Sequence, residues 1–296
     1  MRPIRTRISE SGYRNQFQRQ LEHDEVVAIW RQWMFNFGFE LATAHALREK
    51  RIYVPTYLSF GSEHVPVSLF RVLGNYHLFA QHRAHSYFLS RGGSPESLRD
   101  ELLGLSSGCT GGRGGSASIH APDAQMWGHS GLMGDQVPIA VGYCQASGNK
   151  TLAVMGDASA EEDFVLAALG YAATKNLPIL FLCEDNDFSI LTPVQTRRSW
   201  DLTTVARAFG LSAFDICDDP SEIIGAAETL SNQLPALINV HIARGGWHAG
   251  AGSDGPPEWN RMSIFEDEYS GVVGHETLQE IRTEEIERAR RIWEQS

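Results

Sequence analysis

The sequence lacks the features that define several large classes of protein. No apolar stretch among its 296 residues approaches the roughly 20 residues that a membrane-spanning helix needs. Its N-terminus carries basic residues with no apolar run behind them, so we expect no secretory signal. Its four cysteines form no CxxC pair, so we expect neither a zinc site nor a disulfide framework, and a reducing, cytoplasmic compartment fits best.

Positive charge is also scarce. The 25 Lys and Arg residues stand against 36 Asp and Glu residues, and the formal net charge of −11 argues against nucleic acid or an anionic membrane as the main partner. The glycine-rich segments lack the Gly-Lys-Ser/Thr ending of a Walker loop, and residues 128–132 lack the last glycine of a GxSxG nucleophile elbow. These absences exclude several function classes and name none.

What the chain contains is typical of a globular domain with a sizeable core, with 42% hydrophobic and 21% charged residues. We expect a flexible N-terminal arm over residues 1–20 and a single domain over residues 21–296, because no linker or repeat interrupts the pattern. The 28 glycines are unevenly spread and concentrate in residues 104–115, 128–134 and 245–255.

The middle of the chain alternates between strand and helix patterns. Residues 151–155 and 178–183 are short apolar runs typical of buried strands, and the alanine-rich stretch between them predicts a helix over 161–174. Strand, helix and strand in this order form a parallel, right-handed unit. The alternation continues with helices at 202–209 and 221–231 and strands at 213–216 and 236–241. The sequence therefore predicts an α/β fold with a doubly wound, mostly parallel sheet and helices on both faces.

Further helices are predicted on either side of this region. The aromatic-rich segment 24–50 indicates a buried helix, Ser94 and Pro95 begin a short helix at 94–103, and 276–294 is a charged, amphipathic closing helix. Residues 136–146 predict a helix that packs on the core through Val137, Ile139, Ala140 and Tyr143. Glycine-rich loops are expected at 107–131 and 245–257.

Polar residues follow the two clearest strands. Asp157 comes directly after the first strand and Asn186 after the second, and the carboxyl ends of neighbouring parallel strands meet at one edge of the sheet. A carboxylate and an amide suit Mg²⁺ when phosphates complete the octahedron, and the small residues Gly156 and Ala158 let a diphosphate approach. The alternative is that Asp157 caps the following helix.

This pattern resembles a known signature. Gly156-Asp157 and Asp185-Asn186, with Asn186 following Asp157 by 29 residues, resemble the thiamine diphosphate signature. The segment from Gly156 to Ile190 is similar to the alpha subunit of two-chain 2-oxo acid dehydrogenases of the pyruvate, branched-chain and acetoin types. Three more segments match that family in order: QHRAH at 81–85, GCTGGRGGSASIH at 108–120 and GHSGLMGDQVPIAVG at 128–142. The resemblance covers roughly residues 24–295.

The resemblance implies a role for individual residues. It implies magnesium ligation by the side chains of Asp157 and Asn186 and by the backbone carbonyl of Phe188. It places the guanidinium of Arg83 on the diphosphate, which suits paired phosphate oxygens. The other residues that it implies in cofactor binding are Gln81, His82, Gly131, Met133, Gly156, Ala158, Ser159, Arg244 and His248. Among these, Gly131 and Met133 would lie against the pyrimidine ring, and the alternative for Met133 is a core methionine.

Two histidines are candidate catalytic residues under this resemblance. His248 lies in the second glycine-rich loop and would contact the diphosphate or the reacting intermediate, unless it is a solvated loop residue. His129 would face the substrate or make a structural hydrogen bond. Ala249 replaces the serine of some family members, so we expect no phosphorylation there. Trp247 and residues 248–257 depart from the family pattern, which leaves substrate choice and lipoyl-domain docking open.

Three hypotheses about function follow. The first is an alpha subunit that needs a beta subunit in a two-plus-two heterotetramer, decarboxylates a 2-oxo acid and passes the acyl group to a lipoyl carrier on an acyltransferase. Under the resemblance, the glutamate that activates the cofactor comes from the beta subunit. The second is a subunit of a split carboligase or transketolase-like enzyme that uses thiamine diphosphate and Mg²⁺ to join a carbanion to an acceptor. The third is a degenerate subunit that serves as a scaffold.

Overall fold

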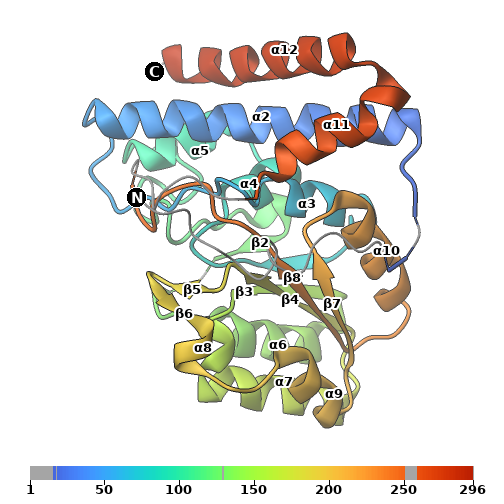
Figure 1. Cartoon of the computed structure of the whole chain (residues 1–296). Coiled ribbons are helices and arrows are strands. Elements are labelled where there is room, and N and C mark those ends of the chain that lie inside the picture. The colour runs from blue at the N-terminus through green and yellow to red at the C-terminus, as the bar shows by residue number, and fades with distance from the viewer. Residues whose placement is uncertain (1–15, 18, 129, 251–258, 296) are drawn as a thin grey trace.

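The computed structural model describes residues 16–17, 19–128, 130–250 and 259–295. A six-stranded parallel sheet lies at its centre, and helices cover both faces (Figure 1). This arrangement confirms the predicted doubly wound α/β architecture. The strand order is β2-β1-β3-β4-β8-β7. In that order the strands are Met126–Trp127, His77–Phe79, Thr151–Gly156, Ile179–Asp185, Ala236–His241 and Ser212–Cys217.

Two layers of helices enclose the sheet (Figure 1). The lower layer consists of α6 (Gln136–Ser147), α7 (Asp163–Lys175) and α9 (Leu202–Phe209). The opposite face is covered by α3 (His64–Leu69), α4 (His85–Ser90), α5 (Pro95–Leu102) and α10 (Pro220–Leu230).

The two faces of the sheet receive alternate residues of each strand. Leu152 and Val154 of β3 belong to the core cluster on the α4, α5 and α10 side, whereas Ala153 and Met155 belong to the cluster on the α6, α7 and α9 side. This alternation is the period of two that an extended chain imposes on its side chains. Because both faces of the central strands are buried, β3 and β4 contain continuous apolar runs, which is what the sequence shows.

An outer layer packs on the upper helices (Figure 1). The long helix α2 (His23–Arg48) lies beside α12 (His275–Glu294), and α11 (Arg261–Val273) precedes α12. Trp30, Trp33 and Phe265 are fully or almost fully buried where α2 meets α11, and the rings of Trp30 and Phe265 stack at 5.5 Å between centroids. The site described below is not part of this layer.

The structure confirms the main predicted elements. The predicted helices at 24–50, 94–103, 136–146 and 276–294 correspond to α2, α5, α6 and α12, and Ser94 caps α5 by accepting the Ser97 N–H. The sequence reasoning missed β1, β2, α3, α4 and α11, together with several shorter elements. These shorter elements are α8 (Val194–Arg197), the antiparallel pair β5 (Phe188–Ser189) and β6 (Thr192–Pro193), and the 3₁₀ turns Pro122–Ala124 and Ser159–Glu161.

One predicted core contact is wrong. Ile139 of α6 is 53% exposed, whereas Val137 and Ala140 of the same helix are fully buried. Tyr143 is half-buried and packs at the edge of the core. The hydrophobic pattern placed Ile139 inward because α6 contains no charged residue to mark its outer face.

Most of the predicted N-terminal arm lies outside the described residues. Within the described part, the ring of Phe17 packs edge-on against Phe214 of β7 at 5.1 Å between centroids. The Gln16 side chain donates a hydrogen bond to the Asp215 carbonyl at 2.8 Å. No helix of the described residues combines the length and apolar character needed to cross a bilayer.

Candidate active site

A cavity of about 260 Å³ lies at the carboxyl ends of β3, β4 and β8. It brings together almost all residues that the sequence assigned to cofactor or metal binding: Gln81, His82, Arg83, Met133, Gly156, Asp157, Ala158, Ser159, Asn186, Phe188, Arg244 and His248. Gly131 does not line this cavity, and His129 lies outside the described residues. Glu162, Glu184, Ser189, Ile190 and Ile242 also line it.

The register of the sheet explains why these segments meet. Gly156 at the end of β3 pairs with Glu184 of β4, and Asp185 pairs with His241 at the end of β8. The three strands therefore end at nearly the same level. The chain segments that leave them form the walls of the cavity, as expected for an open parallel sheet.

Asp157 does not cap a helix. Its side chain is buried, and its carboxylate forms an ion pair with the guanidinium of Arg197. Arg198 donates to the Asp157 backbone carbonyl at 3.0 Å. Burial and the nearby Asp185 carboxylate raise the pKa of Asp157, and the two arginines of the α8 region oppose this rise. The first turn after β3 begins at Ala158, and the N-cap of α7 is Glu162, so the capping alternative is wrong.

Asn186 shapes the turn that follows β4. Its Oδ1 accepts the Phe188 N–H at 3.0 Å, which bends the chain towards the small β5–β6 ribbon. A carbonyl oxygen has two lone pairs, so the same Oδ1 can also serve a cation. Asp157 and Asn186 therefore offer oxygen ligands of the type that Mg²⁺ prefers, although Arg197 now balances the Asp157 charge.

A second cluster of ligand-type side chains lies behind this wall. Asp185, Asp187 and His241 place one ligand atom each within 4.8 Å of one another. Both carboxylate oxygens of Asp185 already accept hydrogen bonds, one from the Asp187 N–H at 3.0 Å and one from the Asn239 amide at 3.3 Å. His241 Nε2 lies 2.9 Å from Asp215 Oδ1. The cluster thus ties together the ends of β4, β7 and β8.

Arg83 connects the wall of the cavity to two loops. Its Nη1 donates to the Leu58 carbonyl at 2.8 Å, and its Nη2 donates to the His248 carbonyl at 2.8 Å. Arg244 donates to the Ile190 carbonyl at 3.1 Å and so fixes the other end of the His248 loop. Gln81 Oε1 is buried and has no hydrogen-bond partner among the described residues. Such an atom suits a pocket that a ligand completes.

The structure adds a buried acid that sequence reasoning missed. Glu184 is 3% exposed, lines the cavity and accepts the Tyr87 hydroxyl at 2.9 Å. Burial raises the pKa of Glu184 to about 7, although the Tyr87 hydrogen bond and the Arg83 charge lower it. The signal in the sequence was its place near the end of a predicted strand, two residues before Asn186.

The first glycine-rich loop, which the family resemblance would place around the cofactor, folds around a carboxylate of the chain itself. The buried carboxylate of Glu101 accepts four backbone N–H groups of this loop: those of Thr110, Gly112, Gly114 and Gly115, at 2.7–2.9 Å. No residue of 104–115 lines the cavity. The N–H groups of this loop therefore surround an internal carboxylate and do not face the cavity.

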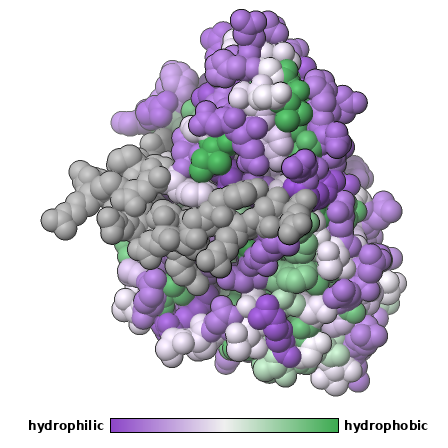
Figure 2. All heavy atoms as spheres, turned by 45° about the vertical axis from the view of Figure 1, so that its right-hand side comes forward, coloured by the Kyte–Doolittle hydropathy of each residue, from purple (hydrophilic) through white to green (hydrophobic). Residues whose placement is uncertain are grey.

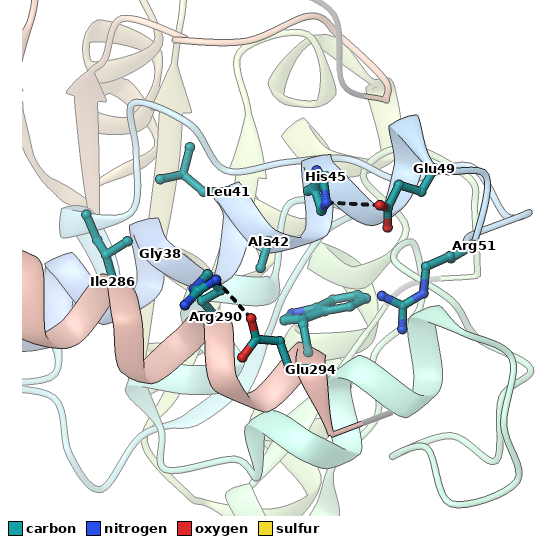
Figure 3. A pocket seen from close by; sticks show the side chains of 10 residues that line it. Gly38, Leu41, Ala42, His45, Glu49, Arg51, Ile286, Arg290 and Glu294 are labelled. Atoms are coloured by element: carbon teal, nitrogen blue, oxygen red, sulfur yellow. Dashed lines mark ion pairs between the residues drawn. The ribbon is translucent and has the colours of Figure 1, made fainter.

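A larger cavity lies elsewhere, between α2 and α12 (Figure 3). It measures about 650 Å³, and its apolar lining includes Leu41, Ala42 and Ile286. The ion pairs His45–Glu49 and Arg290–Glu294, at 3.1 and 2.9 Å, lie at its rim (Figure 3). None of the predicted site residues that the structure describes lines this cavity, so size alone does not locate the site.

Comparison with known proteins defines the class. Residues 35–251 match the model of the family described as dehydrogenase E1 component. This match covers most of the chain, including every segment that lines the cavity. The chain therefore belongs to the dehydrogenase E1 component family.

Individual relatives are similar over shorter stretches. The chain is 31% identical over 215 residues to the pyruvate dehydrogenase E1 component subunit alpha of Zymomonas mobilis, which covers 70% of the chain and 61% of the relative. It is 34% identical over 190 residues to the human subunit alpha, somatic form, mitochondrial, which covers 60% of the chain and 47% of the relative. It is 36% identical over 121 residues to the mitochondrial subunit alpha of Dictyostelium discoideum, which covers 39% of the chain and 32% of the relative. The chain thus spans about a third to three fifths of these relatives.

Proposed function

We propose that the chain is the alpha subunit of a two-chain, thiamine diphosphate-dependent 2-oxo acid dehydrogenase that decarboxylates a 2-oxo acid. The observation that carries this proposal is the single cavity at the strand ends, where residues from five separate segments of the chain converge. These are the residues that the family resemblance assigned to the cofactor. Membership of the dehydrogenase E1 component family supports the same assignment.

The polar walls of the cavity suit the two charged parts of the cofactor. Asp157, Asn186 and the Phe188 carbonyl would ligate Mg²⁺, because hard cations prefer oxygen ligands. The Arg83 guanidinium, fixed by the Leu58 and His248 carbonyls, would bind the diphosphate. When bound, thiamine diphosphate would supply the electron sink for decarboxylation, while the protein supplies position and electrostatics.

The apolar wall would position the ring system. Met133 lines the cavity and would lie against the pyrimidine ring of the cofactor, with Gly131 close by in the chain. His248 would act at the diphosphate end, because its backbone is held by Arg83. His129 is proposed as the residue that faces the substrate.

An uncovered helix face supports a partner subunit. The twelve-residue helix α6 contains no charged residue, yet Ile139 is 53% exposed. In the described part of the chain, no atom outside the helix's own backbone lies within 4 Å of the place where a Cβ of Gly142 would stand. Tyr171 of α7 and Phe209 of α9 are exposed in the same layer. The lower part of Figure 2 mixes apolar side chains among the polar ones. We assign this layer to contacts in a two-plus-two heterotetramer with a beta subunit.

Cofactor binding tests the proposal most directly. The chain with its beta subunit is expected to bind thiamine diphosphate with Mg²⁺, and Arg83→Gln is expected to weaken binding about 10- to 100-fold, because a charge-assisted hydrogen bond is lost. The exposed Arg48→Gln is the matched control and should leave the dissociation constant unchanged. Absence of binding to the wild-type complex, measured by calorimetry, would falsify the proposal.

The acceptor of the acyl group needs a separate assay. We propose a lipoyl group on an acyltransferase, and the carboligase alternative is favoured by Trp247, which is 37% exposed beside His248 and departs from the family pattern. Rapid acylation of a lipoyl domain supports the dehydrogenase, whereas carbon–carbon ligation without it supports the alternative. Undiminished turnover of an Asn186→Ala complex would instead favour the scaffold hypothesis.

A further inference from the structure

A buried hydrogen-bonded relay joins separate segments behind the cavity. Glu40 lies on α2, His85 begins α4, and Ser116 directly follows the glycine-rich loop. His85 Nδ1 lies 3.1 Å from both carboxylate oxygens of Glu40, and His85 Nε2 lies 2.8 Å from Ser116 Oγ. All three residues are fully buried.

The proton positions in the relay follow from its chemistry. Carboxylate oxygens only accept hydrogen bonds, so Nδ1 of His85 donates to Glu40 and Nε2 faces the Ser116 hydroxyl. The order of acid, imidazole and hydroxyl matches that of a hydrolytic triad. Ser116 is fully buried, however, and lines none of the cavities described above, so its hydroxyl does not meet a substrate. The relay therefore needs a different role.

The relay ends on the backbone on either side of Leu58. Ser116 Oγ accepts the Tyr57 N–H at 3.0 Å, and Glu40 Oε1 accepts the Ser59 N–H at 3.1 Å. Leu58 lies between these two N–H groups, and its carbonyl accepts Nη1 of Arg83 at 2.8 Å. The relay thus fixes the peptide groups that flank the carbonyl on which Arg83 rests.

Other contacts connect residues 57–58 to side chains that line the cavity. The Tyr57 ring lies 4.8 Å from the His82 ring and 5.8 Å from the His248 ring, between centroids. Nη2 of Arg83 donates to the His248 carbonyl. Three residues that line the cavity therefore touch residues 57–58, which the relay holds.

We propose that Glu40, His85 and Ser116 are positioning residues that set the Arg83 guanidinium for the diphosphate of the cofactor. The inference rests on the proposed function, because it takes Arg83 as the diphosphate ligand. Paired recognition of phosphate oxygens requires the guanidinium to be held within about 0.5 Å of the productive geometry. A fully satisfied buried network supplies that rigidity, since each of its members is costly to leave without a partner.

Ser116→Ala tests the proposal, because it removes one hydroxyl and little volume. With the beta subunit present, we expect the dissociation constant for Mg²⁺–thiamine diphosphate to rise about tenfold, which is the effect of one hydrogen bond. Binding of thiamine, which lacks the diphosphate, should change less than twofold. Ser118→Ala is the matched control, because Ser118 lies in the same loop and its hydroxyl faces His120 at 3.3 Å, outside the relay.

Two further measurements keep the test decisive. Hydrogen exchange at the Tyr57 amide of the full chain should accelerate in Ser116→Ala and not in Ser118→Ala. Glu40→Gln keeps one acceptor oxygen. It should reduce the preference for thiamine diphosphate over thiamine by a smaller factor than Ser116→Ala does. Equal weakening of thiamine and thiamine diphosphate, or faster Tyr57 exchange with an unchanged preference, overturns the positioning role. Failure of the wild-type complex to bind thiamine diphosphate overturns the proposed function and this inference together.

Discussion

Glu101 and Glu184 are both buried glutamates, and their surroundings differ. The Glu101 carboxylate accepts four N–H groups from residues 110–115. Glu184 lines the cavity, accepts the Tyr87 hydroxyl and has its pKa raised to about 7 by burial. The loop supplies its own anion, whereas the cavity holds an acid whose charge is poorly compensated.

The comparison shows what glycine content does and does not indicate. A loop whose N–H groups converge on one point is a site for an anion, and a carboxylate of the same chain can occupy it. The convergence of polar side chains at the strand ends is the stronger sign of an external ligand. The following changes test this distinction, beginning with the largest expected effect.

Glu101→Gln should destabilise the chain most. The amide NH₂ of glutamine would face two of the four N–H donors, so at least two buried donors would lose their acceptor. We expect a loss of about 3–5 kcal/mol in the free energy of unfolding, measured by urea denaturation. The exposed Glu96→Gln in the first turn of α5 is the control and should stay within about 0.5 kcal/mol of wild type. A loss below about 1 kcal/mol would contradict the proposed importance of the carboxylate.

Gly112→Ala should act on the same loop through sterics. A Cβ at Gly112 would lie 2.5 Å from the carbonyl carbon of Gly104 and 2.6 Å from the carbonyl oxygen of Leu105, and φ is +72°. Because the contacts are with backbone, relief requires the loop to move and the Gly112 N–H to leave Glu101. We expect about 2–4 kcal/mol of destabilisation, read from the same denaturation curves. An unchanged midpoint would show that the loop is loosely held.

Glu184→Gln, unlike the two changes above, should increase the free energy of unfolding at high pH. Because burial raises the pKa of Glu184 from 4.5 to about 7, the folded chain retains a proton that the unfolded chain has released between these values. The contribution of Glu184 to the stability of the wild-type chain therefore falls as the pH rises through this window. Glutamine cannot ionise, so the stability of the variant relative to wild type should rise by about 3 kcal/mol between pH 4 and pH 8.

Thermal unfolding of the metal-free chain between pH 4 and pH 8 measures this difference. Glu162→Gln is the control, because Glu162 lines the same cavity but is exposed. A Glu184→Gln curve parallel to that of wild type would contradict the raised pKa.

The parts of the fold that were predictable from the sequence are those with a local signal. The strands β3 and β4 have continuous apolar runs, β7 and β8 have shorter apolar stretches between predicted helices, and each helix that was predicted has a period or a cap such as Ser94. Strands β1 and β2 have three and two residues, and they are strands because their neighbours supply the hydrogen bonds. No sequence window of that length can indicate them.

The candidate site likewise contains residues that the sequence could indicate and contacts that it could not. Asp157 and Asn186 were predictable because parallel strands end at one edge, which is a rule of topology. The ion pair between Arg197 and Asp157 depends on the path of the chain after β6, so it has no local signal. The relay through Glu40 and His85 joins positions 45 residues apart, and it likewise required the structure.

Gly131→Ala should have the smallest effect on stability and sharpens the contrast with Gly112. Gly131 has φ of +106°, but among the described residues no atom beyond its chain neighbours lies within 4 Å of the place where its Cβ would stand. Only the backbone strain remains, so we expect a loss of about 1 kcal/mol, measured by urea denaturation beside Gly112→Ala. A loss as large as that of Gly112→Ala would reveal a packing contact at Gly131. The family resemblance places Gly131 against the pyrimidine ring. If Gly131→Ala also weakens thiamine diphosphate binding by more than the strain explains, the new methyl group lies in the cofactor site.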